Sequence, residues 1–417
     1  MNIKRVVVTG LGALTPIGNH VAAYWQALTQ GVSGAAPITR FDASKYKTRF
    51  ACELKGYQPE DHFDRKEAKK MDLCSQYAIV ACEEAIKDAQ LNLKQENLER
   101  IGVVWATGVG GLESATRYII EFAQGGDTPK INPFFIPKMI TDMPAGHISI
   151  KYGLQGPNFA TVSACASANN ALIDAAQLIQ LGHADVIVAG GSEAPIVDVG
   201  ISGFNAIKAL SERNESPQTA SRPFDKDRDG FVMGEGAGAL ILESYEHAQA
   251  RGAQIYAELI GVGLSADAHH ITAPHPEGRG LALVMTNALR NAGIQPHDID
   301  YINVHGTSTP PGDITEAKGI QQVFGEDAYQ LNISSTKSMT GHLLGASGAV
   351  ESIASILALQ HQMVPPTINH FTDDEALDPR LNFTFNKAQS RPLNIALSNS
   401  FGFGGHNTSV IFKKWEA

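Results

Sequence analysis

The sequence predicts an α/β fold in which largely buried sheets alternate with layers of helices. Short runs rich in Val and Ile alternate with helical patterns along the chain, which is typical of sheets covered on both faces. A weak internal symmetry is the second observation, and it suggests two related halves. The predicted strands include residues 6–8, 101–105, 185–190, 239–242, 301–304 and 408–412.

The internal symmetry comes from features that recur in the same order. A glycine cluster precedes the strand-like run at 239–242, and a second one precedes the run at 408–412. The helix predicted after Cys165 has a counterpart at 345–360 with an apolar stripe. We therefore expect an N-terminal half, residues 1–255, and a C-terminal half, residues 256–417. The first half carries insertions, including residues 110–153.

Composition and charge restrict the function. A net charge of −10 argues against general nucleic-acid binding, because Lys and Arg are in deficit. Four cysteines without a C-x-x-C pair indicate neither a zinc ribbon nor a redox motif, and they fit a reducing compartment. The N-terminus enters a strand directly, and no apolar run approaches the roughly 18 residues of a membrane helix. We expect a soluble, cytoplasmic protein without membrane contact.

Cys165 lies at a predicted junction of strand, turn and helix. Residues 159–164 form a short apolar run, and a helical pattern starts at Ala166 and is closed by Gly182. Its apolar face consists of Ala168, Leu172, Ala175, Ala176 and Ile179. Free N–H groups and the dipole at a helix N-terminus favour thiolate over thiol, and they can stabilise an oxyanion. We therefore interpret Cys165 as a nucleophile whose thiolate form the helix stabilises.

Two histidines are candidates for the same site. His305 follows a predicted strand, and His342 lies in a polar, glycine-containing loop before a helix. Loops at strand ends commonly carry functional residues in α/β proteins. The alternative is that each is an ordinary structural histidine.

A lysine and a glutamate flank His342 in the sequence. Glu351 falls within an otherwise apolar helix, where a carboxylate needs a partner, and Lys337 is the obvious one. We therefore hypothesise a Lys337–Glu351 pair beside the site. The alternative is an exposed face with two solvated charges.

A glycine-rich string follows the next-to-last predicted strand. Gly402, Gly404 and Gly405 surround Phe403. The string is either a simple tight turn or a loop that brings backbone N–H groups close to a reacting oxygen. In the second case Phe403 is a mobile apolar flap.

Three further patterns are rejected as sites. Residues 10–15 resemble a dinucleotide fingerprint but have Thr15 in place of the third glycine. Residues 225–230 resemble the start of a calcium loop, but its twelfth position is Gly236 rather than Glu. Asn407 begins a glycosylation sequon, which has no meaning in a cytoplasmic protein. We expect neither a bound metal nor a bound cofactor.

Together these strings resemble the β-ketoacyl-acyl carrier protein synthases, most closely the elongating synthase II type. The strings are residues 162–169, 305–310, 337–346 and 399–405. The resemblance runs from the first strand to the last residues. It implies the thiolase fold, with two duplicated α/β halves in five layers (αβαβα), and a homodimer. It also implies decarboxylative Claisen condensation of an acyl group with malonyl-acyl carrier protein in fatty-acid elongation.

The resemblance implies a role for each matching residue. Cys165 carries the acyl group, His305 and His342 promote decarboxylation and stabilise the enolate, and the N–H groups of Cys165 and Phe403 form an oxyanion hole. The phosphopantetheine arm arrives on the carrier protein, so no cofactor is held by the enzyme itself. Contacts to the arm are implied for Thr307, Thr309 and, more weakly, Thr272, and Val109 matches a position that lines the acyl pocket.

An acidic enzyme must still bind an acidic carrier protein. We expect docking on a local basic cluster, with the alternative that it is an ordinary solvated helix face. The candidate docking residues are Arg65, Lys66, Lys69 and Lys70, with Lys130 and Lys208 added by resemblance. One departure is His406, which stands where synthase II usually has Thr, and an extra imidazole there can alter gating or pH response.

Related proteins provide the competing interpretations. A degradative thiolase needs a second cysteine near the C-terminus, and none follows Cys165. The initiating synthase III has Asn in place of His342, and a chain-length factor lacks the nucleophile. A binding module needs no such combination of cysteine, histidines and glycine loop. A specialised condensing enzyme of a polyketide or aryl-polyene pathway remains an alternative, because it shares every catalytic string.

Overall fold

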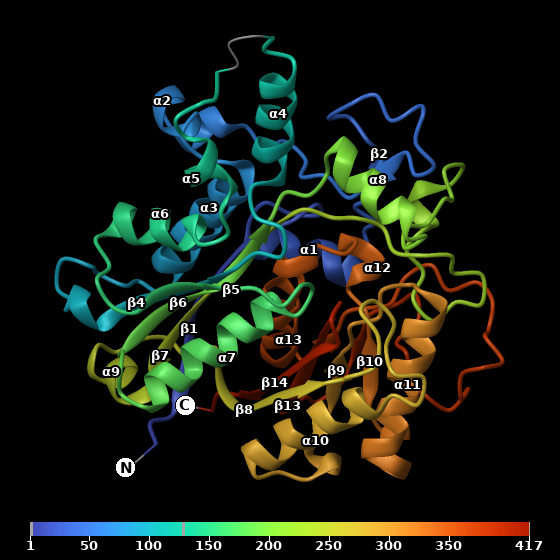
Figure 1. The fold of residues 1–417 in the computed structure, drawn as a ribbon. Helices are drawn as coiled ribbons and strands as arrows, with labels where there is room; N and C mark the ends of the chain where they lie inside the picture. Colours follow the sequence, from blue (N-terminus) through green and yellow to red (C-terminus); the bar gives the residue numbers. More distant parts are fainter. Residues whose placement is uncertain (1–2, 127–129, 417) are drawn as a thin grey trace.

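The computed structural model describes residues 3–126 and 130–416 (Figure 1). The N-terminal half contributes five strands that lie side by side in the order β5-β4-β6-β7-β1. Strands β5, β4 and β6 are parallel, whereas β7 is antiparallel to both β6 and β1. Their bounds are β1 Val6–Leu14, β4 Ile101–Ala106, β5 Asn158–Thr161, β6 Val186–Glu193 and β7 Gly236–Ser244.

The C-terminal half repeats this arrangement in the order β10-β9-β13-β14-β8, with the same pattern of directions. The two sets meet where β1 pairs with β8 over two residue pairs, Val7–Glu258 and Val8–Ala257. The bounds are β8 Ala257–Ala266, β9 Tyr301–Asn303, β10 Asn332–Ser334, β13 Ile395–Gly402 and β14 His406–Lys414. The predicted internal symmetry is therefore present in the strand order.

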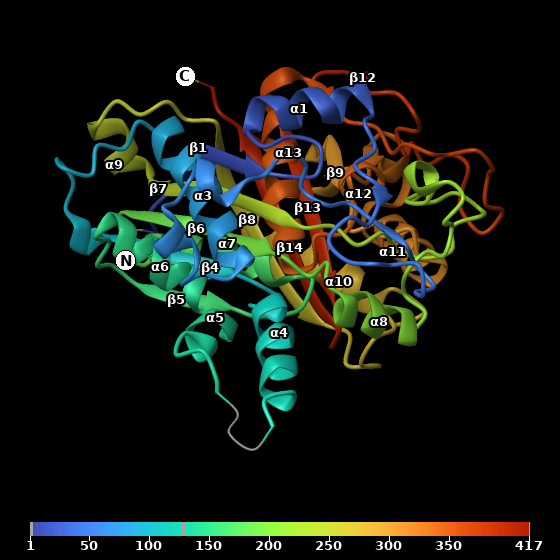
Figure 2. The same ribbon diagram turned by 90° about the horizontal axis from the view of Figure 1, so that it is seen from above.

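Helices complete five layers. Helices α7 (Ser167–Gln180) and α13 (Ser347–His361) contact each other and lie between the two sheets. Helices α3 (Leu73–Asp88) and α6 (Met143–Tyr152) cover the first sheet, and α10 (Arg279–Ala292) with α11 (Pro310–Phe324) covers the second (Figures 1 and 2). The predicted five-layered α/β fold is confirmed.

Burial explains why the central helices take their places. The predicted apolar face of α7 is fully buried, and α13 is buried continuously from Ser347 to Leu359. Small residues allow close packing there, since a Cβ added at Gly238 of β7 would lie 2.9 Å from the Cβ of Ala349. Each central helix therefore packs against sheet residues from both halves.

Smaller elements lie around this core. The predicted insertion at 110–153 contains α4 (Leu112–Ala123), α5 (Phe135–Met139) and α6. Among the described residues, no helix has both the length and the apolar character needed to cross a bilayer. The remaining helices and short strands are α1 Val21–Gln30, α2 Arg65–Ala68, α8 Asp198–Ala206, α9 Tyr245–Ala250, α12 Lys337–Thr340, β2 Ala36–Pro37, β3 Phe50–Ala51, β11 Met363–Val364 and β12 Gln389–Ser390.

Several predicted boundaries differ in detail from the structure, and two of the differences lie near the candidate site. Strand β5 ends at Thr161 rather than at 164, because Ala164 has φ of 51° and turns the chain before Cys165. Helix α13 begins at Ser347 rather than at 345, since residues Leu344–Ala346 form a 3₁₀ turn. Both differences lie where polar and catalytic candidates are placed.

Candidate active site

Cys165 lies in the turn between β5 and α7 and lines a cavity of about 280 Å³. Ser167 fixes this turn, because its hydroxyl accepts the Ser163 N–H at 2.9 Å and donates to the Ala164 carbonyl at 2.6 Å. The side chain of Cys165 is buried. The thiol is therefore held by local hydrogen bonds and shielded from solvent.

The cavity brings together most of the residues predicted from the sequence. His305 and His342 line it beside Cys165, although they come from segments 140 and more residues away in the chain. Its other predicted lining residues are Lys208, Thr272, Thr307, Thr309, Gly402, Phe403 and Gly405. Val109 and Gly404 do not line the cavity. The basic residues Arg65, Lys66, Lys69, Lys70 and Lys130 are exposed and also lie outside it.

His342 contacts the sulfur directly. Its Nε2 lies 3.0 Å from the Cys165 Sγ, and its Nδ1 lies 2.9 Å from the Ser347 hydroxyl at the start of α13. The His305 ring lies edge-on to it, with ring centroids 5.3 Å apart and an interplanar angle of 89°. The two imidazoles therefore form one wall around the thiol.

Both imidazoles are neutral. Burial lowers the pKa of His305 and of His342 well below the usual value, and the nearby positive charge of Lys337 lowers both pKa values further. A neutral imidazole carries one N–H donor and one acceptor nitrogen. The site can thus offer two N–H groups to a developing negative charge without carrying a positive charge itself.

The thiol differs from what the sequence suggested. Burial raises the pKa of Cys165 to about 12, while Lys337 and the backbone N–H groups of Phe403 and Cys165 act in the opposite direction. The backbone N–H groups at this turn favour the thiolate, as expected, but burial outweighs them. The resting group is a thiol, and the adjacent Nε2 of His342 is the nearest acceptor for its proton.

The predicted Lys337–Glu351 ion pair is present. Lys337 Nζ contacts Glu351 Oε1, and each side chain is only 1% exposed, which excludes the alternative of a solvated face. Lys337 lies on α12 and Glu351 on α13, on either side of His342. The lysine acts on the site through its charge, since it lowers the pKa of Cys165 and of both histidines.

A carboxylate missed in the sequence positions His305. Glu316 on α11 accepts the backbone N–H groups of His305 at 2.9 Å and of Gly306 at 2.8 Å. Burial raises the pKa of Glu316 to about 7 despite these hydrogen bonds. Glu316 follows His305 by one loop and the first turns of a helix, and nothing in its own sequence context distinguishes it from a surface residue.

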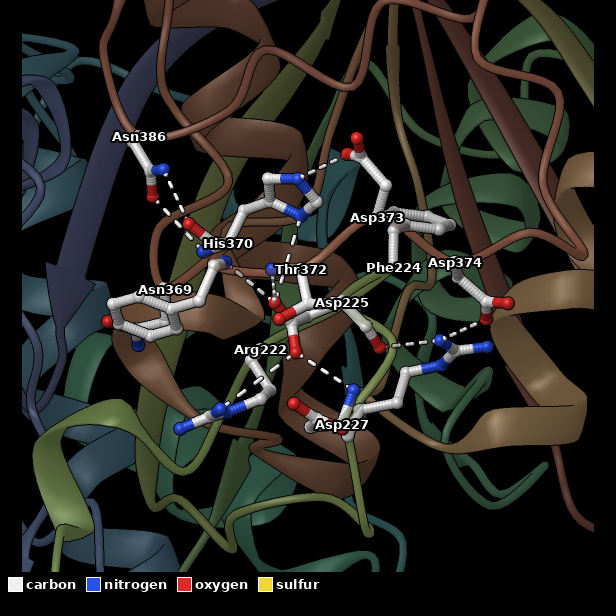
Figure 3. A network of polar contacts seen from close by, with 12 residues as sticks. Arg222, Phe224, Asp225, Asp227, Asn369, His370, Thr372, Asp373, Asp374 and Asn386 are labelled. Carbon is white, nitrogen blue, oxygen red and sulfur yellow. Dashed lines mark hydrogen bonds and ion pairs between the residues drawn. The ribbon is translucent and has the colours of Figure 1, made fainter.

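Residues 225–230, the calcium-like string rejected above, contact two loops, one at residues 371–372 and the other after His305. Asp225 is buried and accepts the N–H groups of Phe371 at 2.6 Å and Thr372 at 2.8 Å (Figure 3). Arg228 pairs with Asp313 at 3.2 Å, and Asp313 accepts the Ser308 N–H. This acidic segment therefore holds the chain beside His305 to the core.

The glycine loop closes over the sulfur. Its Gly404 N–H donates to the Ile271 carbonyl at 2.7 Å, and the Asp267 N–H donates to the Gly405 carbonyl at 2.9 Å. Gly404 and Gly405 have φ of 89° and 75°, which other residues rarely adopt. The backbone N–H groups of Phe403 and Cys165 lie close enough to the sulfur to lower the pKa of the thiol.

Comparison with known proteins agrees with this geometry. The family described as "Beta-ketoacyl synthase, N-terminal domain" matches residues 3–248, and "Beta-ketoacyl synthase, C-terminal domain" matches residues 256–371. A 3-oxoacyl-[acyl-carrier-protein] synthase 2 of Staphylococcus aureus is 51% identical over 99% of each chain. The protein of the same name from Synechocystis is 50% identical, again over 99% of each chain.

Solved structures give the same result. A beta-ketoacyl synthase from Burkholderia phymatum superposes with a TM-score of 0.92 at 35% identity, covering 99% of this chain and 100% of the other. A ketosynthase of a type II polyketide system, in complex with its acyl-carrier protein, superposes with a TM-score of 0.91 at 35% identity and the same coverage. With a thiol and two neutral imidazoles gathered in a thiolase fold, the chain belongs to the β-ketoacyl synthase family.

Proposed function

We propose that this protein condenses an acyl group carried on Cys165 with malonyl-acyl carrier protein, giving β-ketoacyl-acyl carrier protein and CO2. The observation that carries the proposal is the 3.0 Å contact of His342 Nε2 with Cys165 Sγ, beside a second neutral imidazole. Each of the four cysteines is free, which fits action in a reducing cytoplasm.

The first step is acyl transfer. His342 Nε2 accepts the thiol proton as the sulfur attacks the thioester carbonyl of the acyl-carrier protein. The N–H groups of Cys165 and Phe403 stabilise the oxyanion, the carbon–sulfur bond to the carrier breaks, and the departing pantetheine thiolate takes up the proton. The acyl group remains on Cys165 as a thioester while the carriers exchange.

Decarboxylation and condensation follow in the same cavity. Loss of CO2 from the malonyl group leaves an enolate, whose oxygen accepts the N–H groups of His305 and of His342, the latter now in the tautomer that carries its proton on Nε2 and accepts the Ser347 hydroxyl at Nδ1. The enolate carbon attacks the acyl carbonyl on Cys165, the carbon–sulfur bond breaks, and the Cys165 thiolate takes up a proton from water, the one proton that the overall reaction consumes. Thr307 and Thr309, whose hydroxyls lie 3.0 Å apart in the cavity lining, are placed to contact the pantetheine arm, as is Thr272.

Fatty-acid elongation is favoured over a specialised pathway. Identity is 51% to the synthase 2 of Staphylococcus aureus, against 35% to the polyketide ketosynthase. The acyl group then extends from Cys165 toward the loop that carries Val109. A polyketide or aryl-polyene role is the second candidate, since both kinds of enzyme share the residues of this cavity.

The exposed edge of the first sheet supports a homodimer. Strand β5 is paired on one side only, and Phe159 and Val162 beside it are 38% and 56% exposed. Figure 2 places α4 and α5 on the same side of the molecule as β5. These elements and the segment between them add further exposed apolar residues, namely Ile119, Ile120, Phe122, Ile131, Phe134, Ile136 and Ile140. An unpaired edge with an apolar surround is the pattern of a surface covered by a second chain.

Replacement of Cys165 tests the nucleophile. Cys165→Ala should abolish condensation because no thioester can form, whereas Cys165→Gln should retain malonyl decarboxylation, since both histidines remain. The measurements are β-ketoacyl product formation, CO2 release and the mass of the acyl-enzyme adduct with carriers of graded chain length. Normal elongation by either variant would refute the assignment.

Replacement of Glu351 tests the ion pair. Glu351→Gln leaves the charge of Lys337 buried without a counterion, so we expect turnover to fall at least about tenfold and the free energy of unfolding to fall by about 3 kcal/mol. The double variant Lys337→Met/Glu351→Leu should recover stability but not turnover. Glu375→Gln, which breaks an exposed pair with Lys226, is the control. Unchanged kinetics in Glu351→Gln would dismiss a role in the reaction.

Charge reversal tests carrier docking. Lys208 is exposed at the cavity, so Lys208→Glu should raise KM for the acidic carrier severalfold at low salt and abolish its salt dependence. The α2 cluster, Arg65, Lys66, Lys69 and Lys70, should be reversed as a separate variant, and Lys130 as another. Lys94→Glu, at an exposed site outside the cavity, is the control. KM values equal to the control in all three variants would exclude these residues as the docking surface.

Sedimentation tests the dimer. We expect one species of twice the 44.6 kDa chain mass at micromolar concentration. Val162→Asp, which places a charge beside the β5 edge, should shift the protein toward monomer. A wild-type protein that sediments as a monomer under these conditions would contradict the proposal.

A further inference from the structure

Glu193 is a fully buried carboxylate that the proposed mechanism does not use. It is the last residue of β6 and is 0% exposed. Four donors converge on it. The Thr107 hydroxyl and the Val109 N–H donate to Oε1 at 2.6 and 3.2 Å, and the N–H groups of Gly108 and Gly345 donate to Oε2 at 2.7 and 2.9 Å.

The donors come from two segments that the proposed function places around the acyl group. Thr107, Gly108 and Val109 follow β4, on the segment assigned to the acyl pocket. Gly345 lies between His342 and Ser347, whose hydroxyl contacts the His342 ring. One carboxylate therefore joins a segment of the N-terminal half to the turn behind the catalytic histidine in the C-terminal half.

Close packing makes this junction sensitive to small shifts. A Cβ added at Gly108 would lie 2.7 Å from Glu193 Oε2, and one added at Gly345 would lie 2.3 Å from the Gly108 nitrogen. Neither segment has a side chain that separates it from the carboxylate. The hydrogen bonds to Glu193 thus set the separation of the two segments directly.

We propose that Glu193 is a positioning residue that fixes the acyl-pocket segment 107–109 and the turn at Gly345 relative to each other, and so sets acyl chain-length selectivity. The proposal rests on the proposed function, in which Cys165 carries the acyl chain and Val109 is near it. Glu193 touches no reacting atom. Its charge raises the pKa of the Cys165 thiol, but its effect on chain-length selectivity comes through the segments that it holds.

The chemistry of the donors explains why a carboxylate is needed. All four groups donate, and a carboxylate only accepts, with two oxygens that each receive two hydrogen bonds. A glutamine has one oxygen. In the better orientation of the glutamine amide, this oxygen takes the place of Oε2 and still accepts the N–H groups of Gly108 and Gly345. The amide nitrogen then faces Thr107, whose hydroxyl can rotate to accept an amide N–H. The Val109 N–H alone then loses its acceptor.

Because Glu193→Gln loses the hydrogen bond to Val109 and keeps the one to Gly345, chain-length selectivity and malonyl decarboxylation can be measured as separate readouts. In Glu193→Gln the Val109 segment should shift, so the ratio of kcat/KM for long over short acyl-carrier proteins should change by about tenfold, the usual effect of a lost buried hydrogen bond. Malonyl decarboxylation should stay within about twofold of wild type, because Gly345 keeps its acceptor. Glu193→Ala should lower both activities.

Two further variants complete the design. Thr107→Val removes one donor on the Oε1 side, conserves volume and should reproduce the chain-length change without loss of decarboxylation. Glu243→Gln is the matched control, because Glu243 is a buried carboxylate on β7 beside the opposite end of β6 that accepts from Thr9 and Arg251. It should cost stability and leave the chain-length ratio unchanged.

The outcomes separate this proposal from the one on which it rests. The role of Glu193 is overturned if the chain-length ratios of Glu193→Gln and Thr107→Val equal that of Glu243→Gln. It is also overturned if Glu193→Gln loses as much decarboxylation activity as Glu193→Ala. Absence of an acyl adduct on Cys165 in the wild-type enzyme instead overturns the proposed function. If Glu193→Gln does not fold, Thr107→Val alone decides.

Discussion

The structure depends on the burial of one thiol where the two halves of the chain meet. Cys165 precedes α7 and His342 precedes α13, and these two helices form the central layer between the sheets. Their N-terminal ends therefore bring the proposed nucleophile from one half to its proposed proton acceptor from the other. Neither half contains both groups, so the chemistry requires the packed pair.

Burial decides the protonation states as well as the positions. It raises the pKa of the thiol and lowers the pKa of both histidines, which makes the thiol and the two imidazoles neutral at rest. Lys337 supplies the nearby positive charge, and Glu351 balances it within the core. A neutral site with oriented N–H groups is suited to a reaction in which negative charge appears only transiently.

Much of this could be predicted from the sequence, because the informative residues lie in local strings. The residues next to them in sequence identify the main candidates, namely Cys165, His305, His342 and the Lys337–Glu351 pair. The repeated glycine clusters indicate the symmetry of the fold. The partners that hold these candidates are not marked, since Glu193 reaches Gly345 across the fold and Glu316, although close to His305 in sequence, has the sequence context of a surface residue. The protonation state of the thiol could not be predicted for a similar reason, because the N–H groups at a helix start are visible in sequence and the degree of desolvation is not.

The protonated, enclosed state of Cys165 has a consequence for chemical durability. Peroxides and similar oxidants attack thiolates in preference to thiols, and they need access to the sulfur. A buried thiol whose nearest proton acceptor is an adjacent imidazole is poorly matched to such reagents. The burial that the proposed acyl transfer works against is therefore also a barrier to oxidation of the sulfur.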